Sequence, residues 1–468
     1  MDEFIKNLQG KSIHVVGVTG AEGSSILRFL VKHNISNITA HDFSSIDSLE
    51  KNFKLWHKGI ESLERDKLYK QFIADLNNAH LKLGLNYLEN IENADIIFVP
   101  QSWRLYKKEN EPLFRVADKI PFYSLTRLYL DFAPAQIIAV TGTVGKGSTA
   151  NIIYQLLKKG LSANRRMYFA GNETWMLQLA DKLDEMTKED ILVLEISHRQ
   201  LQDDFSRAPR MAIITNFYPN HLDEVSWEEY LKLKLALINK QKSTDIAILN
   251  YDIVQLRLTE KLKSKIIYFS GKYIEMNTKS IQKIHTQIMN NKSDHYAMNI
   301  LAGMTVCDFL GLSVEKMLKI MPQIQSLPAR LELLETFDNI RFYDDIKSTT
   351  PWATLAGLKK LGKNTILVCG GRTKGIDYKE FSIEVEKLVK HIIVLKSELG
   401  EKLVRLLPIG LCEEVTDLYR ALQIAYKQAQ KEDNILISPA AGFFYSDFIK
   451  GKKSIRRLIT SLPPKEQA

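Results

Sequence analysis

The stretch Ile138-Ala-Val-Thr-Gly-Thr-Val-Gly-Lys-Gly-Ser-Thr149 runs from an apolar segment into a glycine- and threonine-rich turn that contains a lysine. Glycines let backbone N–H groups face an anion, and the helix that follows presents its positive N-terminus to the same anion. Lys146 adds a point charge for the terminal phosphates of a nucleotide. Residues 136–140 predict a strand and residues 150–159 a helix, which is the setting that such a loop requires. The stretch therefore predicts an ATP-binding P-loop.

This loop departs from the usual pattern at the position that ligates magnesium. A Ser or Thr normally follows the lysine directly, whereas this chain has Gly147 there and places Ser148 and Thr149 one and two positions later. Either Ser148 takes over as the magnesium ligand or the coordination is weakened. A plain glycine turn is the alternative, but such turns rarely contain Gly-Lys before two hydroxyl residues. The residues expected to contact ATP here are Gly142, Thr143, Gly145, Lys146, Gly147, Ser148 and Thr149.

Length and composition indicate a multidomain globular protein. At 468 residues the chain exceeds one ordinary domain, and about three are expected. No apolar run reaches the roughly 18 residues of a membrane helix and no signal-peptide pattern is present, so we expect a cytoplasmic protein without membrane insertion. The net charge of +9 comes from dispersed lysines without a nucleic-acid motif, which favours anionic small molecules over nucleic acid. Three widely spaced cysteines predict neither a disulfide framework nor a zinc site. A monomer is the working expectation.

The first part of the chain has a Rossmann-like opening. A strand over residues 12–17 precedes two glycines and a helix over residues 24–32, but Thr19 replaces the middle glycine of the dinucleotide pattern. Asp42 follows a second strand and could meet a ribose. Residues 46–83 have apolar positions at helical spacing, which predicts one or two packing helices. Asp131-Phe-Ala-Pro134 predicts a linker.

The rest of the chain alternates strands and helices, with a predicted hinge at Ser326-Leu-Pro-Ala-Arg330. The expected fold is α/β with three domains: a Rossmann-like N-terminal domain, a P-loop mononucleotide-binding central domain and a Rossmann-like C-terminal domain. The expected bounds are 1–133, 134–327 and 328–468. The predicted strands from here on are 191–196, 211–215, 365–369, 391–395 and 434–438, and a helix is predicted over 227–239.

Two residues at strand ends are candidates for metal chemistry. Glu195 ends a buried strand, where a carboxylate is costly unless a cation accompanies it, and magnesium is the natural partner. The alternative is an exposed strand-end carboxylate. His221 lies in the loop after another strand, where strand ends gather in open α/β sheets. Alone it would be an ordinary surface histidine, but its neighbours make it a candidate ligand.

Five further motifs follow the loop in order along the chain. They are His295-Tyr-Ala-Met-Asn299, Leu327-Pro-Ala-Arg330, Tyr343-Asp-Asp-Ile-Lys-Ser-Thr-Thr350, Gly370-Gly-Arg-Thr-Lys-Gly-Ile-Asp377 and Ser438-Pro-Ala-Ala-Gly-Phe443. In this order after a Thr-Gly-Thr-x-Gly-Lys loop, they closely resemble the Mur ligase family. The similarity covers most of the chain and is strongest from residue 136 onward.

The resemblance implies a three-domain enzyme of peptidoglycan precursor synthesis, with links to cell wall, cell shape and cell division. ATP would phosphorylate the carboxylate of the UDP-linked muramoyl precursor UDP-N-acetylmuramoyl-L-alanine, and the amine of D-glutamate would attack the acyl phosphate. The products would be an amide, ADP and phosphate. This chemistry suits the residues, because a carboxylate is a poor acyl donor until phosphorylated and the transfer needs cations at the γ-phosphate.

The resemblance also assigns roles to residues near the phosphates. Lys146 would hold them, Glu195 would bind one Mg²⁺, and His221 and Lys234 would act at a second Mg²⁺. Lys234 ends the Tyr-x-x-x-Lys pattern of residues 230–234 and matches a lysine that the family carbamylates. Only a neutral amine reacts with carbon dioxide, and keeping a lysine neutral at pH 7 costs roughly 4.6 kcal/mol. The alternative is an exposed helix lysine.

Later motif residues are assigned to the nucleotide and to the amino acid. Asn299, Arg330 and Asp345 would contact ATP. The incoming amino acid would be held by Lys347, Thr349, Lys374, Ser438 and Phe443. Two lysines suit a dicarboxylic amino acid, although solvated lysines are the simpler alternative.

The match departs from the family pattern in three places: Val144 and Gly147 in the P-loop, the residues around Phe443, and the N-terminal domain. Two alternatives therefore stay open. One is a related ligase that uses another amino acid, such as L-glutamate, or another acceptor. The other is an ATP-binding protein that has lost catalysis.

Overall fold

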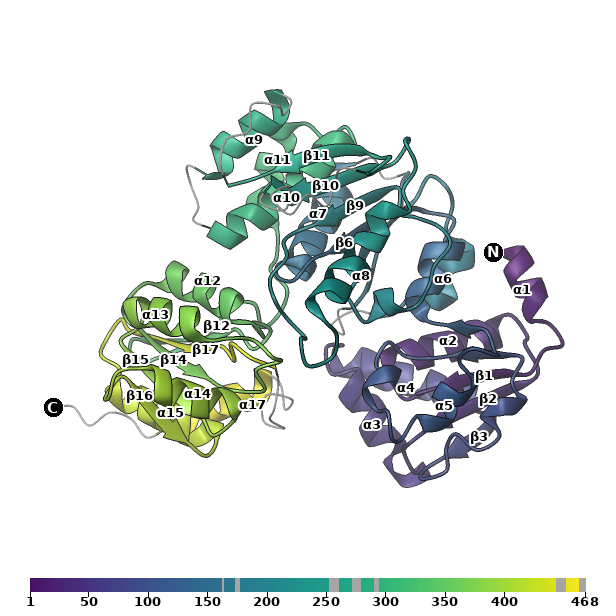
Figure 1. Cartoon of the computed structure of the whole chain (residues 1–468), viewed down its shortest axis with the longest axis horizontal. Helices are drawn as coiled ribbons and strands as arrows, with labels where there is room; N and C mark the ends of the chain where they lie inside the picture. Colours follow the sequence, from purple (N-terminus) through teal and green to yellow (C-terminus); the bar gives the residue numbers. More distant parts are fainter. Residues whose placement is uncertain are drawn as a thin grey trace.

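The computed structural model describes residues 1–161, 164–172, 177–251, 261–271, 279–289, 294–442 and 452–462. They form three α/β lobes that follow one another along the chain, each on its own sheet (Figure 1). Every helix in these ranges is too short or too polar to cross a membrane. The predicted α/β class with three domains is confirmed.

The N-terminal lobe is built on a five-stranded, fully parallel sheet of order β3-β2-β1-β4-β5. This is the Rossmann order for its first strands. The strands are β1 (Ile13–Val16), β2 (Ile38–Asp42), β3 (His80–Leu83), β4 (Ile96–Phe98) and β5 (Phe122–Tyr123). The helices are α1 (Asp2–Leu8), α2 (Ala21–Lys32), α3 (Leu49–Trp56), α4 (Ser62–Leu76), α5 (Glu111–Val116) and α6 (Leu125–Phe132).

The central lobe has a six-stranded parallel sheet of order β11-β10-β9-β6-β8-β7. Its strands are β6 (Gln136–Thr141), β7 (Met167–Gly171), β8 (Ile191–Glu195), β9 (Met211–Ile214), β10 (Ile246–Asn250) and β11 (Lys265–Phe269). Its helices are α7 (Lys146–Gly160), α8 (Trp227–Asn239), α9 (Lys279–Met289), α10 (Asp294–Phe309) and α11 (Val314–Ile320). The P-loop strand β6 therefore lies between β8 and β9.

The C-terminal lobe has a six-stranded sheet of order β12-β13-β17-β14-β15-β16, in which only the β12–β13 pair is antiparallel. Its strands are β12 (Glu332–Phe337), β13 (Ile340–Asp344), β14 (Thr365–Cys369), β15 (His391–Leu395), β16 (Cys412–Val415) and β17 (Asn434–Ile437). Its helices are α12 (Pro351–Leu361), α13 (Lys379–Leu388), α14 (Glu398–Leu406), α15 (Leu418–Gln428) and α17 (Lys452–Thr460).

The hydrophobic cores of the first two lobes are continuous, whereas the core of the third lobe is separate. One hydrophobic cluster runs without interruption from the N-terminal lobe, through Leu27 and Tyr129, to Leu183, Leu192 and Leu235 of the central lobe. The described core residues of the C-terminal lobe form two clusters drawn only from residues after 328. The first two lobes therefore share a core, whereas the third is packed by itself.

Most predicted elements are observed, with two corrections. Residues 80–83, expected to end a helical segment, form the edge strand β3 beside β2. Residues 131 and 132, expected in a linker, belong to α6, because Leu128 and Tyr129 on that helix are buried in the core shared by two lobes.

Candidate active site

The P-loop, Glu195 and the loop that carries His221 lie together at one edge of the central sheet. Val140 of β6 pairs with Glu195 of β8, and Thr141 pairs with Ile214 of β9. All three strands are parallel, so the P-loop, Glu195 and the loop that carries His221 follow strands that end together. This is the edge at which open α/β sheets bind ligands.

The P-loop is held in a form that only glycine permits. Gly145 has a φ of 86° just before α7 begins, and a Cβ there would lie 2.2 Å from Asn299 Oδ1. Val144 N–H donates to Asn216 Oδ1 at 2.8 Å, which ties the loop to the end of β9. Lys146 Nζ donates to Thr143 O at 3.1 Å, so the lysine lies over its own loop, next to the helix N-terminus.

A cavity of about 570 Å³ lies over this edge and has walls from all three lobes. The central lobe supplies the P-loop, Glu195, His221 and Lys234, and the N-terminal lobe supplies Trp56 and Tyr106. Of the residues predicted from the sequence, the cavity gathers Thr143, Gly145, Lys146, Gly147, Glu195, His221, Lys234, Arg330, Lys347, Thr349 and Lys374. Most of its charged groups are cationic, so the cavity suits anionic ligands.

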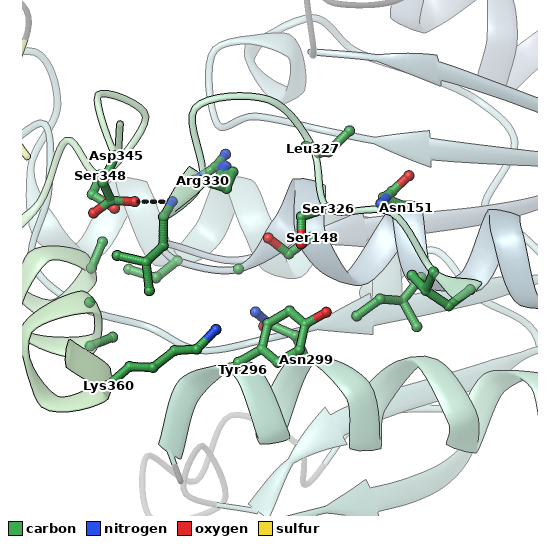
Figure 2. A pocket seen from close by; sticks show the side chains of 18 of the residues that line it. Ser148, Asn151, Tyr296, Asn299, Ser326, Leu327, Arg330, Asp345, Ser348 and Lys360 are labelled. Carbon is green, nitrogen blue, oxygen red and sulfur yellow. Dashed lines mark hydrogen bonds between the residues drawn. The ribbon is translucent and has the colours of Figure 1, made fainter. Parts of the chain in front are cut away.

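A smaller pocket of about 150 Å³ adjoins this cavity through Val144, Gly145 and Arg330. Figure 2 shows Tyr296 and Asn299 from α10 on one side and Asp345 and Ser348 of the C-terminal lobe on another. The pocket continues from the P-loop, and aromatic, amide and carboxylate groups line it together. Its position therefore suits the nucleoside part of a nucleotide whose phosphates lie in the larger cavity.

Glu195 and Lys234 are both nearly inaccessible, at 2% and 1% exposed. Burial lowers the pKa of Lys234 well below its usual value, and repulsion from Lys146 adds to this while Glu195 opposes it. Lys234 Nζ donates to Gly142 O at 2.7 Å, and Asn172 donates to Glu195 at 3.3 Å. The alternatives of an exposed carboxylate and an exposed lysine are therefore excluded.

The C-terminal lobe brings a second buried lysine to the cavity. Lys374 Nζ donates to the backbone carbonyl and the hydroxyl of Thr349, at 3.1 and 3.2 Å. Burial lowers the pKa of Lys374 to about 7, and repulsion from Arg199 adds to this. Lys374 is therefore not the solvated lysine of the simpler alternative.

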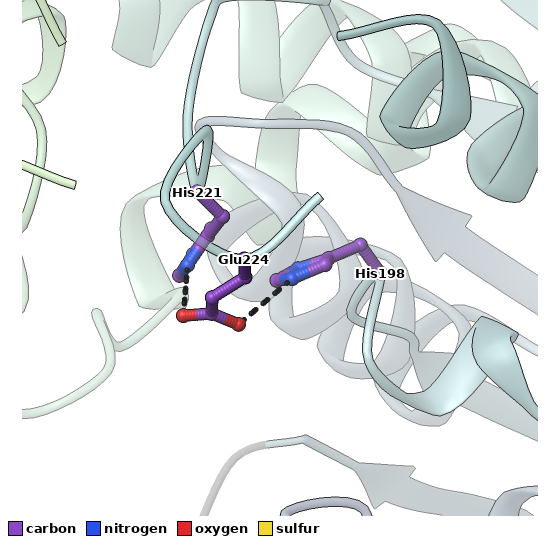
Figure 3. A group of neighbouring side chains, drawn as sticks. All are labelled: His198, His221 and Glu224. Carbon is purple, nitrogen blue, oxygen red and sulfur yellow. Dashed lines mark hydrogen bonds and ion pairs between the residues drawn. The ribbon is translucent and has the colours of Figure 1, made fainter. Parts of the chain in front are cut away.

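His198, His221 and Glu224 form a compact group (Figure 3), and its two histidines line the cavity. His221 Nδ1 lies 3.0 Å from Glu224 Oε1, and His198 Nε2 lies 3.5 Å from Glu224 Oε2. Arg199 donates to both carboxylate oxygens, from Nε at 2.9 Å and from Nη2 at 2.6 Å. Burial opposes the ionised form of Glu224, but the nearby His198 ring and the hydrogen bonds from His221 and Arg199 outweigh it and lower the pKa of this carboxyl.

The remaining predicted residues lie elsewhere or outside the described part. Asn299 and Asp345 line only the smaller pocket, and Gly142 and Thr149 line neither cavity. Ser148 lines the smaller pocket rather than the larger cavity, while the adjacent Thr149 donates to Asn299 Oδ1 at 3.3 Å. Ser438 is fully buried behind the pocket wall, where it donates to Asp345 Oδ2 at 2.8 Å. Phe443 falls outside the described residues.

Two buried carboxyl groups are also engaged by the protein itself. Asp345 accepts from Leu331 N–H at 3.0 Å, and burial raises its pKa to about 6. Asp42, considered for a ribose, accepts from the backbone and hydroxyl of Thr19 and from Ser44 N–H. It therefore stabilises the first βα turn.

Several cavity residues were missed from the sequence. They are Trp56, Tyr106, Asn172, His198, Arg199, Glu224 and Arg372, of which all but Glu224 line the cavity directly. His198 and Arg199 follow Glu195 closely, and Glu224 follows His221, so proximity to the predicted residues was the available signal. Arg372 lies two residues before Lys374 in a motif that was recognised, whereas Trp56 becomes recognisable only when the lobes are placed together.

Comparisons with known proteins agree with this architecture. Residues 140–307 match the family model of the Mur ligase middle domain, and residues 329–441 match that of the Mur ligase glutamate ligase domain. The UDP-N-acetylmuramoylalanine–D-glutamate ligase of Clostridium tetani is 25% identical to this chain, over 98% of the chain and 99% of its own length.

Solved structures show the same fold. The UDP-N-acetylmuramate-alanine ligase of Thermotoga maritima superposes with a TM-score of 0.59 at 17% identity, covering 96% of this chain and 98% of that one. The MurF ligase of Thermotoga maritima, in complex with ADP, gives a TM-score of 0.53 at 18% identity, covering 83% and 91%.

Three α/β lobes around a P-loop cavity thus define a nucleotide-dependent ligase. The chain belongs to the Mur ligase family, since the two family models together span more than half of it and a full-length relative matches from end to end. It is accordingly an ATP-dependent, ADP-forming ligase of peptidoglycan synthesis.

Proposed function

We propose that this enzyme joins D-glutamate to UDP-N-acetylmuramoyl-L-alanine through an acyl phosphate. The Clostridium tetani relative carries the name of that activity and matches nearly the whole chain. The proposal rests mainly on one observation: the P-loop lysine, Lys146, lines the same cavity as Lys347 and Lys374 of the C-terminal lobe. Phosphoryl transfer and amide formation need these groups in one place.

Each part of the chain has a task in this scheme. Lys146 and the N-terminus of α7 bind the phosphates, and the smaller pocket with Asn299 and Asp345 holds the nucleoside. Lys347 and Lys374 bind the carboxylates of the incoming amino acid and orient its amine. The wall that Trp56 and Tyr106 provide holds the UDP-linked precursor. Closure of the cavity excludes water from the acyl phosphate.

The donors fit a divalent cation. Glu195 is a buried carboxylate on the wall that also holds His221 and the P-loop, and oxygen and imidazole ligands suit Mg²⁺ or Mn²⁺. A bound cation would neutralise charge that develops on the transferred phosphoryl group. The group of His198, His221 and Glu224 fits a metal less well, because Arg199 already occupies both oxygens of Glu224.

We propose in addition that Lys234 is carbamylated. Its burial and low pKa favour the neutral amine that reacts with carbon dioxide, and the carbamate would be an anion between Lys146 and the metal ligands. Mass spectrometry does not preserve a labile carbamate, so the test is ¹³C NMR of protein equilibrated with ¹³C-bicarbonate. A carbamate signal present in the wild type and absent from Lys234→Ala supports the proposal; its presence in both contradicts it.

The function is tested by ATP-dependent phosphate release with UDP-N-acetylmuramoyl-L-alanine and a panel of D- and L-amino acids. We expect release with D-glutamate and little release with the others. Release with another amino acid, such as L-glutamate, would keep the ligase and reassign the specificity of the C-terminal lobe. Tight ATP binding without release under any condition would indicate a protein that has lost catalysis.

A further inference from the structure

The Glu224 cluster, defined as His198, Arg199, His221, Glu224 and Arg372, joins three parts of the protein. Arg199 follows β8, His221 and Glu224 follow β9, and Arg372 follows β14 of the C-terminal lobe. Arg372 Nη2 lies 3.4 Å from Glu224 Oε1, and Arg372 Nε lies 3.4 Å from Asp223 Oδ2. A single carboxylate therefore connects two lobes at the cavity wall.

The surroundings of the Glu224 carboxylate do not favour the binding of a metal cation. The guanidinium of Arg199 makes a bidentate pair with it, and Arg372 adds a second positive charge beside the same oxygen. A metal ion at Glu224 would have to displace at least one of these groups and would then lie near two guanidinium ions. The carboxylate of Glu224 is instead placed so that its oxygens orient the side chains that donate hydrogen bonds to it.

The contact with His221 fixes which ring nitrogen carries hydrogen. An ionised carboxylate only accepts hydrogen bonds, so Nδ1 of His221, at 3.0 Å, must be the donor. A neutral ring then presents Nε2 as its acceptor. His221 also has a φ of 59°, in the left-handed region, so its loop holds it in a conformation that costs free energy. A carboxylate behind a histidine is a general means of fixing a tautomer and the direction of the ring.

The contact between Glu224 and Arg372 depends on the position of the C-terminal lobe. Arg372 is backbone-paired with Gly442 and lies two residues before Lys374, whose carbonyl accepts from Leu222 N–H at 3.0 Å. The segment that carries Lys374 thus rests directly on the loop of His221 and Glu224. Both of these contacts exist only when the two lobes are together.

We propose that Glu224 is a positioning residue that couples closure of the C-terminal lobe, sensed through Arg372, to the orientation of His221 in the ligation cavity. The coupling rests on the proposed ligase function, and it assigns to Glu224 no contact with substrate. The bidentate contact with Arg199 holds the carboxylate in place. Arg372 adds its ion pair to Glu224 when the C-terminal lobe closes.

The kinetic test compares Glu224→Ala, Arg372→Ala and the double variant. We expect Arg372→Ala to raise KM for the amino acid by about fivefold, a modest effect because the arginine is half exposed. Glu224→Ala should raise this KM similarly and lower kcat by at least about tenfold. Adding Arg372→Ala to Glu224→Ala should change KM little further, and Arg372→Lys should recover part of the loss.

The controls separate this coupling from general damage. Glu229→Gln removes a more exposed carboxylate on α8 and should match the wild type. Affinity for a non-hydrolysable ATP analogue should stay within about twofold in all variants, because the P-loop is untouched. Additive effects of Glu224→Ala and Arg372→Ala on KM would overturn the proposal. If Glu224→Ala does not fold, the isosteric Glu224→Gln takes its place.

A second readout does not need ligation. Long-range ¹H–¹⁵N NMR of ¹⁵N-histidine protein distinguishes the two neutral tautomers, and His221→Gln assigns the signal. We expect the Nδ1–H form in the wild type and a mixture or reversal in Glu224→Ala. The Nε2–H form in the wild type overturns the proposal even if the enzyme is active, whereas the Nδ1–H form in an inactive wild type refutes only the proposed function.

Discussion

At the scale of single residues, the ionisation of Lys374 determines how this site responds to pH. Burial and nearby arginines lower its pKa to about 7, so the ammonium prevails below pH 7 and the neutral amine above it. An amino-acid carboxylate should therefore bind more weakly as the pH rises from about 7 to 9, by up to about tenfold per pH unit. Calorimetric titration of D-glutamate into enzyme loaded with an ATP analogue measures this dependence.

The matched variant for this prediction is Lys374→Arg. Arginine keeps its charge across the whole range, so the dependence of the dissociation constant on pH should become flat. A dissociation constant of the wild-type enzyme that does not change between pH 7 and 9 would contradict the prediction.

The P-loop, Glu195 and His221 could be predicted from their own sequence context, because they follow buried strands. Lys234 was predicted only through the family resemblance, and the structure brings all of them together. Ser438 differs, because the sequence does not show that its hydroxyl is taken up by Asp345. Glu224 and Arg372 could not be predicted, because their role comes from the contact between them and they are 148 residues apart in the sequence.

At the scale of elements, the P-loop turn depends on the absence of a side chain at Gly145. In Gly145→Ala the new methyl group would collide with Asn299, in addition to the cost of about 1 kcal/mol for a left-handed alanine. We expect ATP affinity to fall by at least about tenfold. Gly311→Ala is the matched control, since Gly311 has nearly the same φ, 87°, with nothing within 4 Å of the added Cβ.

Isothermal titration with an ATP analogue and thermal unfolding of both variants separate the two contributions. Both should lose similar stability through the backbone, whereas only Gly145→Ala should lose nucleotide affinity. Equal affinities in the two variants would show that the approach of Asn299 to the loop has no part in binding.

The helical segment after β2 brings an aromatic ring to the site. Trp56 ends α3, is 43% exposed and lines the cavity. We expect Trp56→Ala to raise KM for the UDP-linked precursor by about tenfold, as is typical for loss of an aromatic contact, with KM for ATP unchanged. Leu55→Ala is the control, because Leu55 is similarly exposed and does not line the cavity. Parallel effects of the two substitutions would contradict a direct contact.

Elements were predictable where their residues are buried on both faces. The strands β14 and β15 and helix α8 have the predicted bounds, because central parallel strands form unbroken apolar runs and α8 has a clear start signal in Ser226, which accepts from Glu229 N–H. Edge strands were harder. The strands β3 and β16 have exposed or polar residues, which at this length suit a helix or a loop equally well. Their partners, not their sequences, make them strands.

At the scale of the whole molecule, an aromatic stack between two lobes helps to hold the C-terminal lobe in place. Tyr218 of the central lobe stacks on Trp352 of α12, with ring centroids 4.8 Å apart. We expect Tyr218→Ala to shift the molecule toward an open form and to raise KM for the amino acid by about threefold to tenfold, because an aromatic pair contributes about 1 kcal/mol. Small-angle X-ray scattering should show a larger radius of gyration in Tyr218→Ala than in the wild type.

Tyr218→Phe keeps the ring, so it should retain the stack on Trp352 and stay closer to the wild type than Tyr218→Ala. Trp352→Ala should reproduce Tyr218→Ala, and the double variant should be no more open than either single variant. A radius of gyration that does not change in any of these variants would show that the stack does not stabilise the closed form.

The division of hydrophobic cores has a consequence for how the lobes fold. The two lobes that hold the P-loop and the aromatic wall share one core and must change together. The third lobe, which carries Lys347 and Lys374, has cores of its own and meets the others mainly through polar and aromatic contacts. We therefore expect this lobe to fold independently of the other two, so that replacing it with the C-terminal lobe of a relative would leave their shared core intact.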